Sequence, residues 1–367
     1  MEGDLEKAAA AAGDDVFSGG EAKWPREGND DHRHRAMGMY GKNDASSFYK
    51  PTELLPMRHT DGPLLPGFLM PMDTMEVFFV KVARLIDGGG LQWPLEVYGD
   101  VAVRDSLDRM RNYLFRRDRN NCQTLVSPQA RPINNASPIK ANNLIKYVFF
   151  VECVICVQDS LLEFTGPSRA VMLLDEPIFE IDLKVKAKEC SSSSSEDKVL
   201  CLDYFGYNNI PYRGTSSYAI TEEVSSESCA MEFRFAHVKR SVEATIAARI
   251  ITTGSGRFRF SARFTAHTTS MVGEDVVLLD SRGQEVPVAE DGEVVLRRRV
   301  VVVEEQGELI LGMEGMLLGG AAAAAEIEST CVVQKLRYYA RSALRSRAVF
   351  EIGSIRIQML VAWSLLP

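Results

Sequence analysis

From residue 75 onward, hydrophobic and polar residues alternate along the chain with a period of two. Side chains of a β-strand point to opposite faces in turn, so this pattern predicts strands with one buried and one solvent-facing side. One-sided strands are typical of antiparallel sheets, because parallel sheets are covered on both faces. The clearest alternating segments are residues 95–104, 179–186, 242–250, 257–264 and 355–363.

Turn-forming residues separate these segments. Glycine, proline, aspartate and serine cluster at residues 87–90, 166–167, 280–283 and 291–292, and such clusters favour tight connections between strands. Helical periodicity is nearly absent before residue 330. The sequence therefore predicts an all-β fold, an antiparallel β-sandwich or partly closed barrel, with at most one or two short helices.

The N-terminal residues differ from the rest of the chain. Residues 1–55 have few large apolar side chains and no periodicity, which predicts a disordered lead. Residues 56–74 follow as an extended, proline-rich approach to a β-sandwich domain at 75–367. Weak internal sequence similarity leaves open a duplication that produced two halves, 75–205 and 230–367.

Composition and charge narrow the cellular setting. The formal net charge of −8 argues against global binding to DNA or to an anionic membrane. The N-terminus lacks the pattern of a secretory signal, and the longest apolar run, at 147–157, is too short to span a bilayer. Seven cysteines without framework spacing fit reduced thiols. These features predict a cytoplasmic or nuclear protein.

Candidate catalytic and metal-binding motifs are weak. The C-x-x-C at 153–156 has no second pair for zinc and lies in an apolar run, where thiols act as small hydrophobic residues. His32 and His34 lie in the predicted lead. Asp100, Asp105 and Asp108 lack the spacing of a calcium loop, so a solvated face is the favoured interpretation over a cation site. No cofactor is predicted.

Two basic clusters are candidate contact surfaces. Residues 104–117 interleave arginines with aromatic residues, as in surfaces that stack nucleic-acid bases, although a strand with a polar face explains the pattern better. In the second cluster, at 335–347, arginines spaced four apart predict a basic stripe on a helix. This possible basic contact surface comprises Arg337, Arg341, Arg345 and Arg347.

Several segments, in order, resemble a known family. They include PMRHTDGP at 56–63, LQWPLEVYGDVAVRDSL at 91–107, LLEFTGPSRAVMLLDEPIFEIDLKVK at 161–186 and VAWSLL at 361–366. They are similar to a grass-lineage domain of unknown function (domain of unknown function 6598), which in some members is joined to a ribosome-inactivating rRNA N-glycosidase domain. The resemblance covers most of 56–366 and implies no site residues.

Two departures from the family matter. Residues 126–158 intervene where a short turn is expected, which indicates an insertion. The resemblance to N-glycosidase fusions also implies a test for the pattern Glu-Ala-x-x-Arg, which ribosome-inactivating enzymes carry in their active site. Here Glu243 and Ala244 are followed by Arg249, which is too distant, and the segment alternates like a strand. The chain is therefore expected to be the companion domain without the enzyme.

Three functions remain open. The first is a non-enzymatic module that binds a protein partner, in plant defence or stress. The second is a ribosome- or RNA-binding module that uses 335–347 and 109–119, whose binding would weaken steeply with salt. The third is an enzyme whose pair of carboxylates assembles only in the fold. The first is favoured, chiefly because the sequence lacks a catalytic motif.

Overall fold

The computed structural model describes residues 50–62, 69–128, 160–187, 196–208, 214–252, 259–318 and 331–366. Within them the chain consists of β-strands and one short 3-10 turn, η1 (Arg119–Asn121). The first strands are β1 (Met72–Leu85), β2 (Leu95–Arg104), β3 (Asn112–Arg117), β4 (Gln123–Leu125), β5 (Val171–Met172), β6 (Ile178–Val185), β7 (Lys198–Gly206) and β8 (Tyr218–Ser225). The others are β9 (Cys229–Ile250), β10 (Phe260–Thr268), β11 (Val276–Asp280), β12 (Glu293–Val294), β13 (Val300–Glu304), β14 (Glu308–Leu317), β15 (Val332–Tyr339), β16 (Arg345–Ile352) and β17 (Ile355–Ser364).

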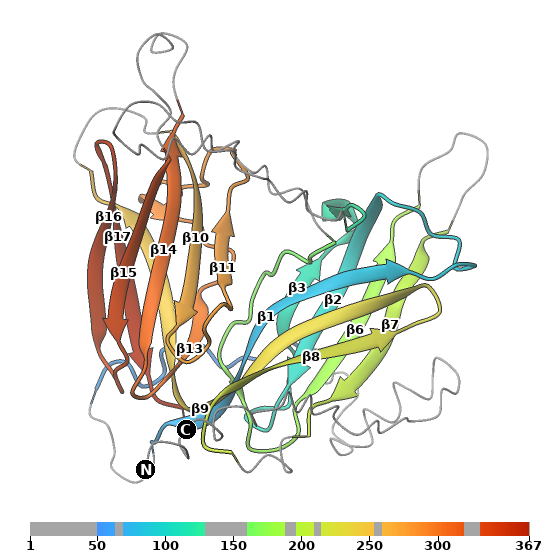
Figure 1. Ribbon diagram of the computed structural model, residues 1–367, viewed down its shortest axis with the longest axis horizontal. Helices are drawn as coiled ribbons and strands as arrows, with labels where there is room; N and C mark the ends of the chain where they lie inside the picture. Colours follow the sequence, from blue (N-terminus) through green and yellow to red (C-terminus); the bar gives the residue numbers. More distant parts are fainter. Residues whose placement is uncertain are drawn as a thin grey trace, which may run out of the picture. The chain divides into compact units, whose positions relative to one another are not determined.

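The strands form three sheets (Figure 1). The shared sheet has the order β16-β17-β9-β1-β5, with β8, β12 and β13 also pairing with β9. The N-terminal sheet has the order β3-β2-β6-β7, with β4 pairing with β2, and the C-terminal sheet has the order β11-β10-β14-β15. All pairs between these strands are antiparallel. The predicted all-β, antiparallel architecture is confirmed.

The apolar side chains form two hydrophobic cores. The first core joins the N-terminal sheet to β1 and the first part of β9, and its Phe179 stacks on Phe205 at 4.5 Å between ring centroids. The second core joins the C-terminal sheet to the rest of β9 with β13, β16 and β17, and it contains the fully buried Trp363. The described residues therefore contain two sandwiches, whereas their origin by duplication stays a prediction.

Strand β9 belongs to both sandwiches. Its 22 residues pair with β1 and β8 through the first half and with β12, β13 and β17 through the second half (Figure 1). Phe233 and Phe235 enter the first core, while Ala244 and Ile246 enter the second. Between these halves Arg240 has a φ of 40°, a left-handed conformation that interrupts the regular strand. The strand thus links the two cores through its backbone.

Residues 50–62 pack against the strands. The backbone N–H of Thr52 donates to the carbonyl oxygen of Arg111 at 2.9 Å, and the N–H of His59 donates to Ser364 Oγ at 3.0 Å. The final residues of the predicted disordered lead, 50–55, therefore take part in the fold, and 57–60 form a turn instead of an extended segment. The rest of the lead, 1–49, lies outside the described residues, as does most of the suspected insertion at 126–158.

The helix predicted at 335–347 is wrong. Residues 332–339 form β15 and residues 345–352 form β16, with a connection between them. A spacing of four places side chains on one face of a helix, but an even spacing also places them on one face of a strand. The sheet decides the outcome, because Leu336 pairs with Leu311 of β14 and Tyr338 is buried.

Candidate functional site

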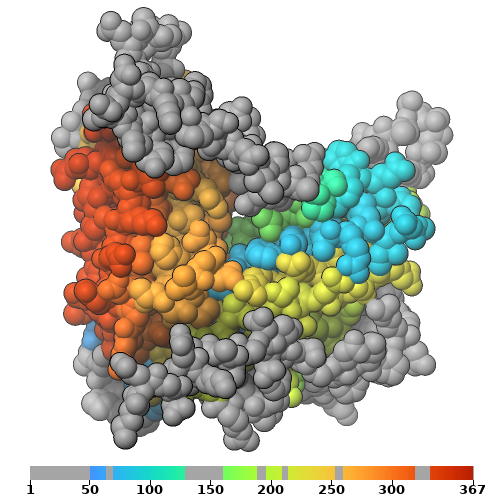
Figure 2. Space-filling model, viewed as in Figure 1, coloured from blue at the N-terminus to red at the C-terminus, as the bar shows by residue number. Residues whose placement is uncertain are grey.

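The four arginines predicted as a contact surface are all exposed. Arg337 lies on β15, Arg345 and Arg347 lie on β16, and Arg341 lies in the connection. The strands β15 and β16 are edge strands of different sheets, the C-terminal sheet and the shared sheet. The arginines therefore follow the edge of the second sandwich instead of forming one stripe. Atoms of the C-terminal residues, coloured red, form part of the surface in Figure 2.

Carboxylates neutralise two of these four arginines. Arg337 Nη1 lies 3.0 Å from Glu308 Oε2, and Arg345 Nη2 lies 2.7 Å from Asp61 Oδ2. The side chains of Lys335, Arg341 and Arg347 make no hydrogen bond or ion pair with any residue that the structure describes. The free positive charge of this edge therefore resides on these three side chains.

Large apolar side chains are exposed on the same segment. Val333 is 63% exposed, Tyr339 73% and Leu344 62%. Leu344 also has a φ of 73°, a left-handed conformation that is unusual for a residue with a branched side chain. Its N–H donates to the carbonyl oxygen of Thr60 at 3.0 Å, and its own carbonyl oxygen accepts from Trp363 N–H at 2.9 Å. These bonds fix the backbone of Leu344 while its side chain stays in solvent. We define the edge surface as Val333, Lys335, Arg337, Tyr339, Arg341, Leu344 and Arg347.

A side chain closes one end of the gap between the two edge strands. Gln334 Nε2 donates to the carbonyl oxygen of Glu351 at 2.8 Å, and Gln334 Oε1 accepts from the N–H of Glu351 at 3.0 Å. This amide occupies the backbone N–H and C=O groups of Glu351 in β16. A partner would therefore contact the edge surface through side chains more readily than through a free strand edge.

The other basic cluster, at 104–117, is bound to carboxylates. Arg104 Nε and Arg111 Nε lie 2.6 and 2.7 Å from the two oxygens of Glu180. Arg116 covers the ring of Tyr113 at 4.5 Å, a geometry of cation–π contact. Glu180 neutralises Arg104 and Arg111, and residues Asn112–Arg117 form β3. The cluster therefore fits a strand with a polar face.

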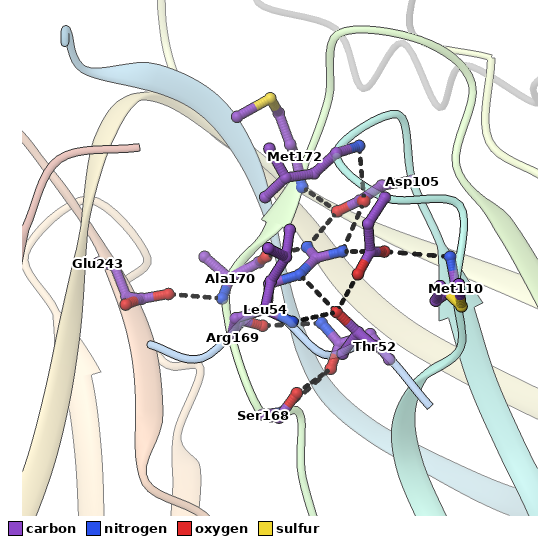
Figure 3. A network of polar contacts seen from close by, with 12 residues as sticks. Thr52, Leu54, Asp105, Met110, Ser168, Arg169, Ala170, Met172 and Glu243 are labelled. Carbon is purple, nitrogen blue, oxygen red and sulfur yellow. Dashed lines mark hydrogen bonds and ion pairs between the residues drawn. The ribbon is translucent and has the colours of Figure 1, made fainter. Parts of the chain in front are cut away.

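Two of the three aspartates considered as cation ligands, Asp105 and Asp108, converge on an arginine instead (Figure 3). Arg169 Nη1 and Nη2 donate to the two oxygens of Asp105 at 2.7 and 2.9 Å, and Nη2 also lies 3.0 Å from Asp108 Oδ1. Asp105 further accepts the N–H of Met172 at 2.8 Å. Asp100 lies elsewhere, 3.6 Å from Arg116. The three aspartates therefore do not form one site.

A second buried acid lies beside this network. Glu243 of β9 accepts the N–H of Ala170 at 2.8 Å (Figure 3). It also accepts the N–H of Met57 at 2.9 Å. Burial raises the pKa of Glu243, and these two N–H groups act in the opposite direction. With 2% of its surface exposed, Glu243 joins the segments that it touches and faces no open surface. The strand conformation predicted for this Glu-Ala segment is confirmed.

An ion pair is buried between β1 and the residues before β13. Arg298 forms a hydrogen bond with Glu76, which also accepts the N–H of Val302 at 2.7 Å. Burial raises the pKa of Glu76 and lowers the pKa of Arg298. Buried charges of this kind need their partners, so the pair ties the second sandwich to β1.

A buried histidine of β9, His237, lies beside the first residues of β1. His237 Nε2 is 2.9 Å from Asp73 Oδ2, and Lys239 Nζ lies 2.8 Å from the same oxygen. Tyr207 Oη is 3.2 Å from His237 Nδ1. Burial lowers the pKa of His237, against the influence of Asp73. For Asp73 burial acts to raise the pKa, but hydrogen bonds from Lys239, His237 and the N–H of Arg240 outweigh it and lower the pKa.

Other candidate motifs lie outside the described residues, namely the C-x-x-C at 153–156 and both histidines of the lead. Among the described residues, no group of three or more histidine, cysteine or acidic side chains could hold a metal ion. In the same part of the chain, no helix is long and apolar enough to cross a membrane.

Comparison with protein families gives one match. A domain of unknown function (DUF6598) matches residues 74–361, which covers both sandwiches and the edge surface. The chain belongs to this family. No curated protein is similar enough to the DUF6598 chain to serve as a relative.

Solved structures show only remote likeness to this DUF6598 member. Human GIVD cytosolic phospholipase A2 matches 82% of this chain at 8% identity with a TM-score of 0.25, and the match spans 31% of the phospholipase. A structure of two C2 domains of extended synaptotagmin 2 matches 86% of this chain and 99% of that chain, at 8% identity and a TM-score of 0.25. Likeness of this size carries no argument about function.

Proposed function

We propose that this chain is a non-enzymatic protein-interaction module that binds its partner through the edge surface. The observation that carries the proposal is the exposure of Tyr339 and Leu344 beside Arg341 and Arg337. Aromatic residues and arginine are enriched where protein interfaces gain most of their binding energy. Leu344 holds an apolar side chain in solvent on a left-handed backbone, and such conformations cluster at functional sites.

The charge of the segment indicates the chemistry of the partner. Residues 331–350 contain five basic residues, Lys335, Arg337, Arg341, Arg345 and Arg347, and no acidic residue. Arg341 and Arg347 have no carboxylate partner among the described residues. A partner segment that supplies acidic side chains beside an aromatic or aliphatic anchor would satisfy both features. The partner is therefore proposed to be an acidic protein segment.

The same surface is less suited to RNA. A surface that follows a phosphate backbone needs sustained positive charge, whereas Glu308 and Asp61 neutralise Arg337 and Arg345. Glu314 is exposed on the neighbouring strand β14. This mixture of charges favours a protein partner, and the ribosome-binding alternative becomes one outcome of the test.

The test selects peptides from a random displayed library on the purified full chain. We expect acidic peptides that carry one or two large apolar residues. Their affinity, measured by fluorescence polarisation, should fall at least about tenfold in a Tyr339→Ser/Leu344→Ser variant, because a lost hot-spot contact exceeds about 1.4 kcal/mol. It should also fall in an Arg341→Gln/Arg347→Gln variant, with a weaker dependence on salt.

The matched control is Leu174→Ser. Leu174 is also exposed, at 59%, but it lies outside the edge surface, next to Leu173 of the first core. Equal affinity in the control and in the Tyr339→Ser/Leu344→Ser variant would contradict the proposal. Ribosome co-sedimentation forms the second arm. One outcome is that the chain pellets with ribosomes in a salt-sensitive manner that the arginine variant loses and the Tyr339→Ser/Leu344→Ser variant keeps. That result would identify RNA, and not a protein, as the partner.

A further inference from the structure

Three arginines that are distant in sequence converge on one carboxylate, away from the edge surface. Arg117 Nη2 lies 2.5 Å from Glu163 Oε2, Arg297 Nη1 lies 3.1 Å from the same oxygen, and Arg282 Nη2 lies 3.2 Å from Glu163 Oε1. Three guanidinium groups thus share one carboxylate, and we call these four residues the arginine cluster.

The members of the cluster come from different parts of the fold, and backbone N–H groups anchor two of them. Arg117 is the last residue of β3, and the N–H of Glu163 donates to the side-chain oxygen of Gln123 at 2.9 Å. Arg282 lies in the turn after β11, and the N–H of Arg297 donates to the carbonyl oxygen of Leu278 in β11 at 3.0 Å. Arg117 and Glu163 therefore belong to the N-terminal side of the fold, and the other two arginines come from the C-terminal side.

The acid beside Arg282 is shared with another arginine. Asp280 accepts the N–H of Arg282 at 2.8 Å, and its other oxygen lies 3.7 Å from Arg263. In the network around Arg169 the ratio is the reverse, because one guanidinium there faces both Asp105 and Asp108. In the arginine cluster, by contrast, three guanidinium groups share the single carboxylate of Glu163.

Burial makes this charge costly for Arg117. Its side chain is 10% exposed, and its buried Nε has no hydrogen-bond partner among the described residues. Burial lowers the pKa of Arg117 below its usual value, Glu163 acts in the opposite direction, and Arg297 and Arg282 lower it further. An anion beside the cluster would offset this repulsion and supply acceptors for charge-assisted hydrogen bonds.

Solvent reaches the outer members of the cluster. The side chain of Arg297 is 45% exposed and that of Arg282 is 28% exposed, while Glu163 is 16% exposed. A ligand can therefore approach from the side of Arg297 and Arg282, with Arg117 behind them. Planar guanidinium groups in a fixed position match the geometry of phosphate oxygens.

We propose that the arginine cluster of Arg117, Arg282 and Arg297 around Glu163 binds a phosphate group. The ligand approaches Arg297 and Arg282. Glu163 competes with it for the guanidinium groups, and it holds the arginines together when no ligand is bound. Because a dianion attracts the guanidinium groups more strongly than a monoanion does, it binds more tightly at this site.

Titration calorimetry of the full chain with inorganic phosphate at low salt tests this site. We expect saturable binding that weakens at least about tenfold in Arg297→Gln, since a hydrogen bond between charged groups is worth enough for that change. Glu163→Gln should bind phosphate more tightly, because the competing carboxylate is gone. Phosphate should bind more tightly at mildly alkaline than at mildly acidic pH, where it is less dianionic, while sulfate should show no such change.

The control is Arg249→Gln, an arginine that pairs with the single carboxylate of Asp291 and is 54% exposed. Equal weakening in Arg249→Gln and Arg297→Gln, or no saturable binding by the unmodified chain, overturns the proposal. Because Glu163→Gln leaves three guanidiniums without their shared acceptor and can unfold the protein, Arg282→Gln serves as a second test. It should also weaken phosphate binding while circular dichroism confirms the fold.

Two sources of the phosphate group remain, and a vesicle arm distinguishes them. If a lipid headgroup is the ligand, the chain should co-sediment with vesicles of phosphatidylcholine that contain a phosphoinositide. The Arg297→Gln variant should then no longer co-sediment with them. Binding of inorganic phosphate without vesicle binding identifies a free phosphate compound. Either result supports the arginine cluster as the site, and vesicle binding that Arg297→Gln retains counts against it.

Discussion

Replacing Arg169 with methionine tests whether the network of Figure 3 stabilises the fold through charge. The substitution removes the bidentate partner of Asp105, whose side chain is 1% exposed. Removal of one partner from a buried ion pair costs about 3–5 kcal/mol. Two backbone N–H groups, of Leu107 and Met172, still donate to Asp105 at 3.0 and 2.8 Å. We therefore expect a loss of about 3 kcal/mol, at the lower end of that range.

A double-mutant cycle makes this reasoning refutable. In Arg169→Met/Asp105→Asn the buried group is neutral, so the double variant should be more stable than Arg169→Met alone. Urea unfolding can be followed in each core, because Trp93 packs against the first core and Trp363 is buried in the second. A Trp24→Phe background removes the remaining tryptophan. Additive losses from the two substitutions, or a loss below about 1 kcal/mol in Arg169→Met, would show that charge is not the cause.

Three further substitutions test other parts of the fold. Gly99→Ala should destabilise the protein by more than about 1 kcal/mol in urea, because Gly99 has a φ of 117° and an added Cβ would lie 2.1 Å from the carbonyl oxygen of Asp182; Gly273→Ala, with a φ of 86° and open space, should cost less. Burial raises the pKa of Glu243 from 4.5, so the contribution of Glu243 to the free energy of unfolding declines as pH rises above 4.5. A difference in unfolding free energy between wild type and Glu243→Gln that stays constant as pH rises above 4.5 would contradict the raised pKa. Burial lowers the pKa of His237 from 6.5, so stability should fall as pH drops below 6.5, and thermal unfolding of His237→Gln should show a smaller fall.

Local pattern was sufficient to predict some of the strands. The alternation at 95–104, 179–186 and 355–363 corresponds to β2, β6 and β17, since burial of one face imposes a period of two on the sequence. The helix at 335–347 failed for a related reason, because a spacing of four satisfies both a helix and a strand. Pairing of Leu336 with Leu311 of β14, which no local pattern contains, decides between them.

The polar sites could not be predicted from local sequence. Arg298 and Glu76 are separated by 222 positions, and Arg169 and Asp105 by 64. Each residue looks like an ordinary charged position on a strand or turn until the sheets bring the partners together. The exposed arginines of 337–347 were identifiable because composition alone marks a basic segment, but their distribution over two edge strands follows from the topology of the sheets.

The length of β9 limits how this protein can be divided. Because both cores take residues from Cys229–Ile250, a break at either end of that strand leaves one sandwich without its part of β9. A fragment that ends before residue 229 lacks a strand of the first core, and one that starts after residue 250 lacks a strand of the second. Recombination between genes, or expression of a fragment, that divides the chain at either end of β9 would therefore not transfer two self-contained units.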